Sequence, residues 1–199
     1  MNILQHIVND IQKDLVLKKQ IVPIDRLESS PLFERQTNSL RQRIVKTEGI
    51  IAEHKRRSPS KQNINFGLRL ADVAQGYESA GVAGMSVLTN NQYFGGSIED
   101  LLLARQACEL PLLRKEFMVD EYQVLEAKAN GADAILLIAA CLERPDIQIL
   151  STLAQQLGME VLLEVHNADE LKKSIMPSID MIGVNNRDLT SFRVSLKTS

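Results

Sequence analysis

The sequence has only two cysteines and no tryptophan, and neither cysteine stands at a metal-binding or disulfide-framework spacing. Cys108 and Cys141 lie far apart, with no CxxC pair or Cys/His cluster around either of them. We therefore expect both thiols to be reduced and structural, as is usual for cysteines beside apolar segments. His54 and His166 also have no ligand partners at a suitable spacing, so no metal site is predicted.

Long hydrophobic runs and an excess of one charge are also absent. Residues 1–14 do not have the basic flank and apolar core of a signal peptide, and no run approaches membrane-spanning length. The net charge is −2 without a long basic stretch, which argues against a nucleic-acid partner. The short basic cluster 55–57 suits a small anion better. We expect a cytoplasmic protein with one sizeable core in 199 residues and no membrane partner.

The first part of the chain has helical periodicity. Apolar residues recur at helical spacing over 2–20, which predicts an amphipathic helix that ends before Pro23. Ser30 and Pro31 then predict the start of a second helix that runs through Leu40 towards Gly49. Residues 1–48 are therefore predicted to form a helical N-terminal extension without strands.

From residue 49 onward, short apolar runs alternate with helix-like segments. Helix starts are indicated by Ser97 with Asp100, by Asp120, and by Asn167 with Glu170. The predicted strands cover 49–52, 84–88, 112–115, 134–138, 161–163 and 179–184. The predicted helices cover 68–79, 98–108, 120–130 and 145–157, with further helices starting at 167 and at 195.

This alternation predicts a parallel sheet covered by helices, either an open doubly wound sheet or a (β/α)₈ barrel. No GxGxxG motif follows the first strand, which argues against a dinucleotide-binding sheet. Polar side chains end several strands, and a barrel would gather them at one mouth. We predict an α/β fold, a (β/α)₈ TIM barrel over 49–199 that is truncated after about six βα units.

The run PLLRKEF at 111–117 places Lys115 at the end of an apolar strand, with Phe117 close behind. The carboxyl ends of parallel strands are where α/β proteins place their chemistry, and partial burial disfavours an ammonium ion. Taken alone, this stretch also fits a lysine that ends a strand and points into water.

Several segments resemble the indole-3-glycerol phosphate synthase family of tryptophan biosynthesis. The matching segments are IAEHKRRSPS at 51–60, SVLT at 86–89, YFGGS at 93–97, LRKEF at 113–117, ADAILLIAA at 132–140, LEVH at 163–166 and GVNNRDL at 183–189, with PLFER at 31–35. The matches follow in register along the whole chain. Three residues depart from the family pattern: His54 replaces an apolar residue, Gln62 a glycine, and Glu116 an aspartate.

The resemblance implies a carboxy-lyase that closes the indole ring of 1-(2-carboxyphenylamino)-1-deoxyribulose 5-phosphate, with loss of carbon dioxide and water. It implies Lys115 as general acid and Glu164 as general base or dehydration partner, with support from Glu53 and Lys55. The residues implied in substrate binding are Ser58, Phe94, Phe117, Asn185 and Arg187. No cofactor is implied. The expected partners are a phosphorylated small molecule and, as candidates, other enzymes of the tryptophan pathway.

Two alternatives stay open at this point. The charged strand ends could form a buried ion-pair network without catalysis, and Ser58 could serve only the turn around Pro59. Barrels of this kind commonly bind phosphate after strands seven and eight, so we expect the phosphate-site residues beyond Ser199. The chain by itself is then expected to be inactive, with a non-catalytic truncated barrel fragment or a phosphate-ligand binding protein as the alternative.

Overall fold

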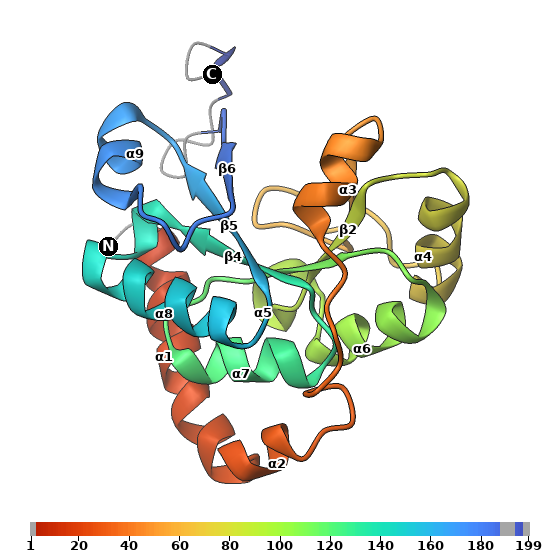
Figure 1. The fold of residues 1–199 in the computed structure, drawn as a ribbon, viewed down its shortest axis with the longest axis horizontal. Helices are drawn as coiled ribbons and strands as arrows, with labels where there is room; N and C mark the ends of the chain where they lie inside the picture. Colours follow the sequence, from red (N-terminus) through yellow and green to blue (C-terminus); the bar gives the residue numbers. More distant parts are fainter. Residues whose placement is uncertain (1–2, 188–193, 197–199) are drawn as a thin grey trace.

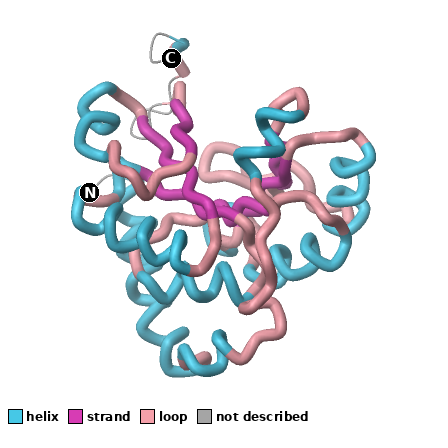
Figure 2. The backbone as a smooth tube through the Cα atoms, viewed as in Figure 1, coloured by secondary structure: helices cyan, strands magenta, loops and turns pink. Residues whose placement is uncertain are grey.

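A six-stranded sheet positions the helices and loops of the protein (Figure 1). The computed structural model describes residues 3–187 and 194–196. Within these residues six parallel strands pair in chain order, from β1 to β6 without reversal. The strands are β1 (Ile51–His54), β2 (Gly84–Leu88), β3 (Leu112–Lys115), β4 (Ala134–Ile138), β5 (Glu160–Val165) and β6 (Met181–Val184). The sheet curls into a half-barrel (Figure 2), whereas a doubly wound sheet would reverse its strand order. The α/β barrel-type prediction is confirmed over these strands.

Helices cover the convex side of the curled sheet, as Figure 1 shows for α4, α6, α7, α8 and α9. The helices of the described residues are α1 (Ile3–Ile21), α2 (Ile24–Glu28), α3 (Leu40–Lys46), α4 (Leu70–Ser79), α5 (Asn91–Phe94), α6 (Ile98–Ala107), α7 (Glu121–Ala129), α8 (Arg144–Gln156) and α9 (Ala168–Ser174), with a 3₁₀ turn at Ala139–Cys141. Each strand thus runs back to the next through a helix on the outside, as parallel pairing requires.

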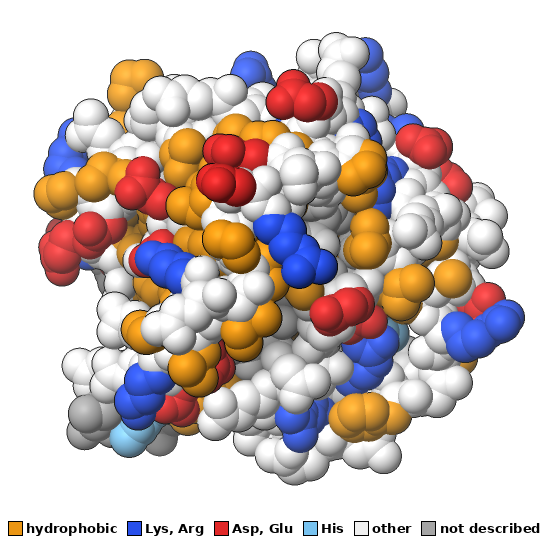
Figure 3. Space-filling model, turned by 90° about the horizontal axis from the view of Figure 1, so that it is seen from below, with side chains coloured by type: hydrophobic (Ala, Val, Ile, Leu, Met, Phe, Trp, Pro, Cys, Tyr) orange, Lys and Arg blue, Asp and Glu red, His pale blue; other side chains and the backbone are white. Residues whose placement is uncertain are grey.

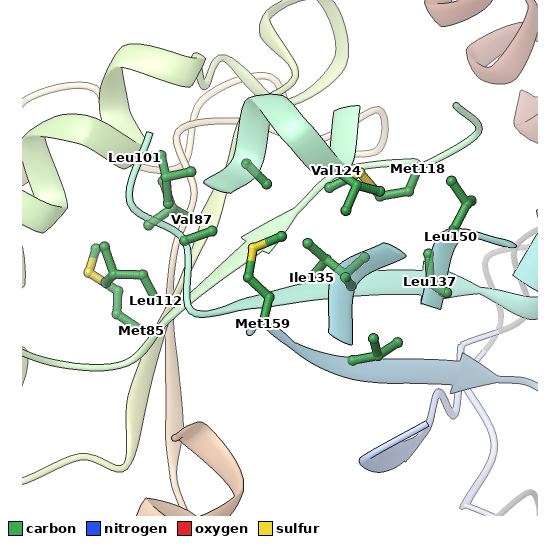
Figure 4. Close-up of a cluster of buried hydrophobic side chains, with 14 of the residues drawn as sticks. Met85, Val87, Leu101, Leu112, Met118, Val124, Ile135, Leu137, Leu150 and Met159 are labelled. Atoms are coloured by element: carbon green, nitrogen blue, oxygen red, sulfur yellow. The ribbon is translucent and has the colours of Figure 1, made fainter. Parts of the chain in front are cut away.

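The main core lies between the strands and these outer helices. Met85, Val87, Ile135 and Leu137 project from the strands, and Leu150 of α8 packs with them (Figure 4). Because side chains alternate along a strand, the neighbouring residues face the other way. A second cluster therefore forms on the concave side, and its buried members are Leu113, Ala134, Leu136 and Ile138 from the strands, with Leu40 of α3.

The first predicted helix is confirmed as α1. It buries Ile7, Ile11 and Leu15 against α7, where Tyr122 and Ala129 belong to the same apolar cluster. The helical spacing of these residues explains why one side of α1 is buried while the other side meets solvent.

The second predicted helix is wrong over residues 31–39. This segment forms a turn and then runs extended, and a helix begins only at Leu40, where Ser39 caps α3. The Asp133 carboxylate accepts hydrogen bonds from the Arg35 guanidinium at 2.5 Å and from the Asn38 backbone N–H at 2.7 Å. An amide that donates to a distant carboxylate cannot donate within a helix. The domain boundary at residue 48 stays a prediction.

The helix starts predicted from capping residues are confirmed for three helices. Ser97 and Asp100 form the capping box of α6, Asp120 caps α7, and Asn167 caps α9. The short helices α2 and α5 were not predicted, because segments of four or five residues have too little periodicity to detect. Residues 197–199 of the helix predicted at 195 lie outside the described residues.

The face shown in Figure 3 carries charges of both signs. Lysine and arginine side chains lie among acidic ones on the face shown in Figure 3. In the described part of the chain, no helix combines the length and apolarity that a membrane crossing requires.

Candidate active site

All nine residues predicted for the site line one pocket of about 160 Å³ at the carboxyl ends of the strands. They are Glu53, Lys55, Ser58, Phe94, Lys115, Phe117, Glu164, Asn185 and Arg187. The parallel pairing of all strands explains this convergence, because it places their carboxyl ends along one rim of the curled sheet. The roles of these residues in catalysis and binding stay predictions.

A carboxylate between two lysines forms the charged centre of the pocket. Oε2 of Glu53 lies 2.6 Å from Nζ of Lys115, and Oε1 lies 2.6 Å from Nζ of Lys55. Burial by itself would raise the pKa of Glu53, but the Lys115 and Lys55 ammonium groups outweigh burial and lower it. All three side chains keep about a quarter to a third of their surface exposed. Lys115 is therefore paired across the pocket mouth and does not point away into water.

Glu164 of β5 lies at a second polar part of the pocket. Its Oε1 accepts a hydrogen bond from Nδ2 of Asn185 at 3.0 Å, and Nε2 of His166 lies 3.5 Å away. Behind it, Glu170 accepts from the His166 backbone N–H at 2.8 Å. His166 thus stands next to the candidate base, a contact that the sequence reading did not anticipate.

Two aromatic rings form an apolar wall. The centroids of Phe94 and Phe117 are 6.2 Å apart, with 31° between the ring planes. Phe94 ends the short helix α5, where Gly95 takes the left-handed conformation with φ of 69°. A Cβ on Gly96 would lie 1.8 Å from the Leu88 carbonyl oxygen, so only glycine fits there.

Helix α1 contributes pocket residues that sequence reasoning missed. Ile3, Leu4 and Ile7 line the pocket from its first turns. Further along α1, Asp10 accepts a hydrogen bond from the Tyr93 hydroxyl at 2.7 Å, next to Phe94. The helical periodicity showed that α1 has an apolar side. Only the fold shows that the first turns of this side reach the pocket.

The loop after β1 combines a turn with a pocket lining. The backbone of Ser58 pairs with Lys61, and the Ser58 hydroxyl lies 3.2 Å from that of Ser60. The turn around Pro59 is therefore present, and Ser58 lines the pocket as well. Both readings of Ser58 agree with this geometry.

The basic cluster at 55–57 does not form one anion site. Arg56 makes two hydrogen bonds to Asp100, at 2.5 and 2.8 Å, and Arg57 donates to the Asn91 carbonyl at 2.6 Å. Of the three side chains, only Lys55 lines the pocket. The expectation of a small-anion site from all three is wrong, because both arginines fasten the loop to the segment after β2. His54 is buried outside the pocket, and burial lowers its pKa.

Among residues 3–187 and 194–196, no three His, Cys, Asp or Glu side chains gather as a set of metal ligands. The available polar groups of the pocket are ammonium groups, a guanidinium group, carboxylates, hydroxyls and an amide. Such a set can bind an anion, transfer protons and hold a planar ring against the two phenylalanines.

Comparison with known proteins gives consistent matches. The family model described as indole-3-glycerol phosphate synthase matches residues 4–199. A protein named indole-3-glycerol phosphate synthase from Bacteroides thetaiotaomicron is 41% identical over 199 residues, which are 100% of this chain and 76% of that protein. Proteins of the same name from Azoarcus sp. and Chromobacterium violaceum are 48% and 53% identical, over 86% and 75% of this chain. The chain spans 66% and 57% of the lengths of those two.

Similarity to solved structures is lower. The carboxyl transferase domain of Rhizobium etli pyruvate carboxylase with 3-hydroxypyruvate aligns with 74% of this chain and 30% of that chain. The TM-score is 0.45 and the sequence identity 12%, which is too low to bear on function.

Proposed function

Because the chain belongs to the indole-3-glycerol phosphate synthase family, we propose that it carries the catalytic half of a lyase of tryptophan biosynthesis. The reaction closes the indole ring of 1-(2-carboxyphenylamino)-1-deoxyribulose 5-phosphate and releases carbon dioxide and water. The observation that carries this proposal is the Glu53 carboxylate held between Lys55 and Lys115, beside the Phe94–Phe117 wall, in one pocket.

Substrate binding follows from the distribution of charge and apolar surface. The aryl ring would lie against Phe94 and Phe117, with the first turn of α1 on the other side. The carboxylate on that ring would meet the ammonium groups of the pocket. Asn185 and Arg187 would hold the hydroxyls of the sugar chain, since both line the pocket beside β6.

Ring closure requires an acid at the ribulose carbonyl. Lys115 would donate a proton to the carbonyl oxygen while the ring carbon that bears the carboxylate attacks the carbonyl carbon. The new carbon–carbon bond takes its electrons from the ring, and the loss of carbon dioxide returns a pair of electrons to the ring. Glu53 would accept hydrogen bonds from Lys115 before and after this transfer and so hold its ammonium at the reacting oxygen.

Dehydration then completes the indole. Glu164 would take the proton from the carbon next to nitrogen while Lys55 assists the departing hydroxyl, which leaves as water. Asn185 fixes one oxygen of Glu164 at 3.0 Å, so that the other oxygen remains available. A pair of carboxylates and a pair of lysines can thus serve both steps.

We also propose a cytoplasmic location, with other enzymes of tryptophan biosynthesis as candidate partners, because the family's substrate and product belong to that pathway. The phosphate-binding residues are proposed to lie on further βα units. Within the described residues, β1 and β6 each pair on one side only, and Ile182 and Val184 of β6 stay 48% and 45% exposed. Further units would cover these positions.

The experiment follows indoleglycerol phosphate formation by its fluorescence, first with residues 1–199 alone and then with an added polypeptide that carries two further βα units. We expect no turnover from the chain alone, because remote binding energy at the phosphate holds the reacting centre in place. We expect turnover from the mixture. If the mixture binds the substrate and forms no product, the lyase proposal fails and the phosphate-ligand binding protein takes its place.

A further inference from the structure

We propose that Glu116, which lines the pocket, is a positioning residue that holds the loops after β2 and β3 together and thereby sets the Phe94–Phe117 wall. The inference rests on the proposed function in one respect, because it takes this wall to bind the aryl part of the substrate. Glu116 itself is buried, with 8% of its surface exposed. Neither Lys115 nor any other ammonium or guanidinium group makes a direct ion pair with it among the contacts found in the described residues.

One carboxylate joins two loops. Oε2 of Glu116 accepts a hydrogen bond from the Thr89 hydroxyl at 3.0 Å, and Oε1 accepts from the Asn90 side-chain amide at 3.4 Å. Oε1 also accepts from the Phe117 backbone N–H at 3.0 Å. Thr89 and Asn90 directly follow β2, whereas Phe117 belongs to the loop after β3. The carboxylate is therefore a shared acceptor for both loops.

Each loop holds one of the two aromatic rings in place, Phe94 after β2 and Phe117 after β3. Oδ1 of Asn90 caps α5 by accepting from the Tyr93 backbone N–H at 2.9 Å, and Phe94 is the last residue of α5. On the other loop, Gln123 of α7 donates to the Phe117 carbonyl at 3.0 Å and accepts from the Val119 N–H at 2.8 Å. A buried amide thus fixes the Phe117 segment from the side opposite to Glu116.

Two linked ion pairs, Arg114–Glu126 and Glu126–Lys18, support this arrangement from α7 and α1. Arg114 donates to the Thr89 hydroxyl at 3.2 Å and to Oε2 of Glu126 at 2.6 Å. Oε1 of Glu126 in turn accepts from Lys18 of α1 at 2.6 Å. Since α1 also lines the pocket, the network connects three parts of the pocket lining: the loop after β2, the loop after β3, and α1. Burial raises the pKa of Glu116, which agrees with a carboxyl group that meets Arg114 only through a hydroxyl.

The test measures binding of 2-aminobenzoate, the aryl part of the proposed substrate, by its own fluorescence. We compare wild type with Glu116→Ala, Glu116→Gln and, as a matched control, Glu160→Ala. Glu160 also fixes a loop, by accepting from the Ser39 hydroxyl and the Arg41 N–H, but it lies at the other end of the sheet.

We expect Glu116→Ala to weaken binding by about tenfold, whereas Glu160→Ala leaves it unchanged. Glu116→Gln should restore binding to within about threefold of wild type, because its carbonyl oxygen can still accept from the Phe117 N–H and its amide can donate to Thr89. Equal binding by wild type and a folded Glu116→Ala, or equal losses in Glu116→Ala and Glu160→Ala, would overturn the proposal.

A second readout does not need a ligand. The protein labelled with 4-fluorophenylalanine gives ¹⁹F signals for its five phenylalanines, and substitution assigns those of Phe94 and Phe117. Both signals should shift in Glu116→Ala and hold their positions in Glu116→Gln and Glu160→Ala. If Glu116→Ala does not fold, Asn90→Ser keeps an oxygen that can cap α5 and removes the amide that donates to Glu116, and it should shift the Phe94 signal. If wild type fails to bind 2-aminobenzoate, the proposed function is contradicted, and the ¹⁹F signals still decide the inference on Glu116.

Discussion

Two acidic groups at opposite ends of the same sheet, one buried and one partly exposed, are used in different ways. Asp133, just before β4, has no exposed surface and accepts from four donors of this chain. These are the Arg35 and Arg105 guanidinium groups and the backbone N–H groups of Asn38 and Leu112. Glu53, at the carboxyl end of β1, meets only two lysines and faces a pocket.

The two clusters differ in whether a ligand can still reach their charged groups. The hydrogen bonds of Asp133 come entirely from the protein, so a ligand has no access and the cluster can only stabilise the fold. The two lysines at Glu53 keep 31% and 34% of their side-chain surface exposed and can still meet an anion. In parallel α/β barrels the amino ends of the strands commonly serve stability and the carboxyl ends chemistry. Both ends of this sheet follow that division.

The largest effect is expected from Lys115→Ala, which breaks the carboxyl-end cluster. Loss of the acid should lower turnover of the complete enzyme by about 10²–10⁴-fold or more, and the melting temperature should change little. Turnover and thermal unfolding are measured side by side. Lys172→Ala is the control, since Lys172 is 78% exposed on α9 and should leave both unchanged. A Lys115→Ala enzyme with near-normal turnover would exclude Lys115 as the acid.

Asp133→Asn breaks the cluster at the other end and should have the opposite profile. It leaves Arg105 buried next to a neutral amide, and removing one partner of a buried pair costs about 3–5 kcal/mol of unfolding free energy. Urea unfolding measures this loss, with Asp72→Asn as the control for an exposed pair, where less than about 1 kcal/mol is expected. Equal losses for the two variants would contradict a structural function of the Asp133 cluster.

A smaller effect on turnover is expected from Glu164→Gln. The amide keeps a contact with Asn185 but cannot take a proton, so kcat should fall more than KM rises. Steady-state kinetics separates the two constants. Unchanged kcat with a raised KM would instead identify Glu164 as a group that only binds.

The sequence predicted the carboxyl-end site better than the amino-end cluster, for a physical reason. Lys115 and Glu164 follow short apolar runs, and a parallel sheet brings such strand ends together whatever the details of the loops. Asp133 and Arg35 are 98 residues apart, and Asp133 and Arg105 are 28 apart. No local pattern joins them, so their contact and the extended path of residues 35–39 could not be read from the sequence.

The dependence on contacts between distant residues also explains why the part of the pocket lined by α1 was not predicted. The spacing of Ile3, Leu4 and Ile7 predicted an apolar helix face, but the side of the sheet that this face meets depends on the connection through residues 31–39. Helix caps were predicted well because Ser97 and Asp100 act within one turn. Local hydrogen bonds can be read from sequence, whereas the docking of α1 depends on distant contacts such as Tyr93 with Asp10.

The smallest effect is a change in stability at acid pH. It separates the contribution of Glu53, between Lys55 and Lys115, from that of other carboxylates. The two lysines outweigh burial and hold the pKa of Glu53 below its ordinary value of 4.5 in the folded protein. The stability from ionised Glu53 is therefore complete above that ordinary value and is lost as pH falls through the lower, folded pKa. Glu53→Gln cannot contribute this dependence.

Urea unfolding of wild type and Glu53→Gln between about pH 6 and pH 3 tests this prediction. Burial raises the pKa of Glu126, but Arg114 and Lys18 outweigh it and lower the pKa overall, so both proteins lose some stability in acid. Only the difference between them reports on Glu53. This difference should shrink as the pH falls below about 4.5, whereas parallel curves would mean that the lysines do not stabilise the ionised form. The effect is small because the cost of burying the Glu53 carboxylate offsets much of its attraction to the two lysines. The quarter of its side-chain surface that stays exposed gives a substrate access to it.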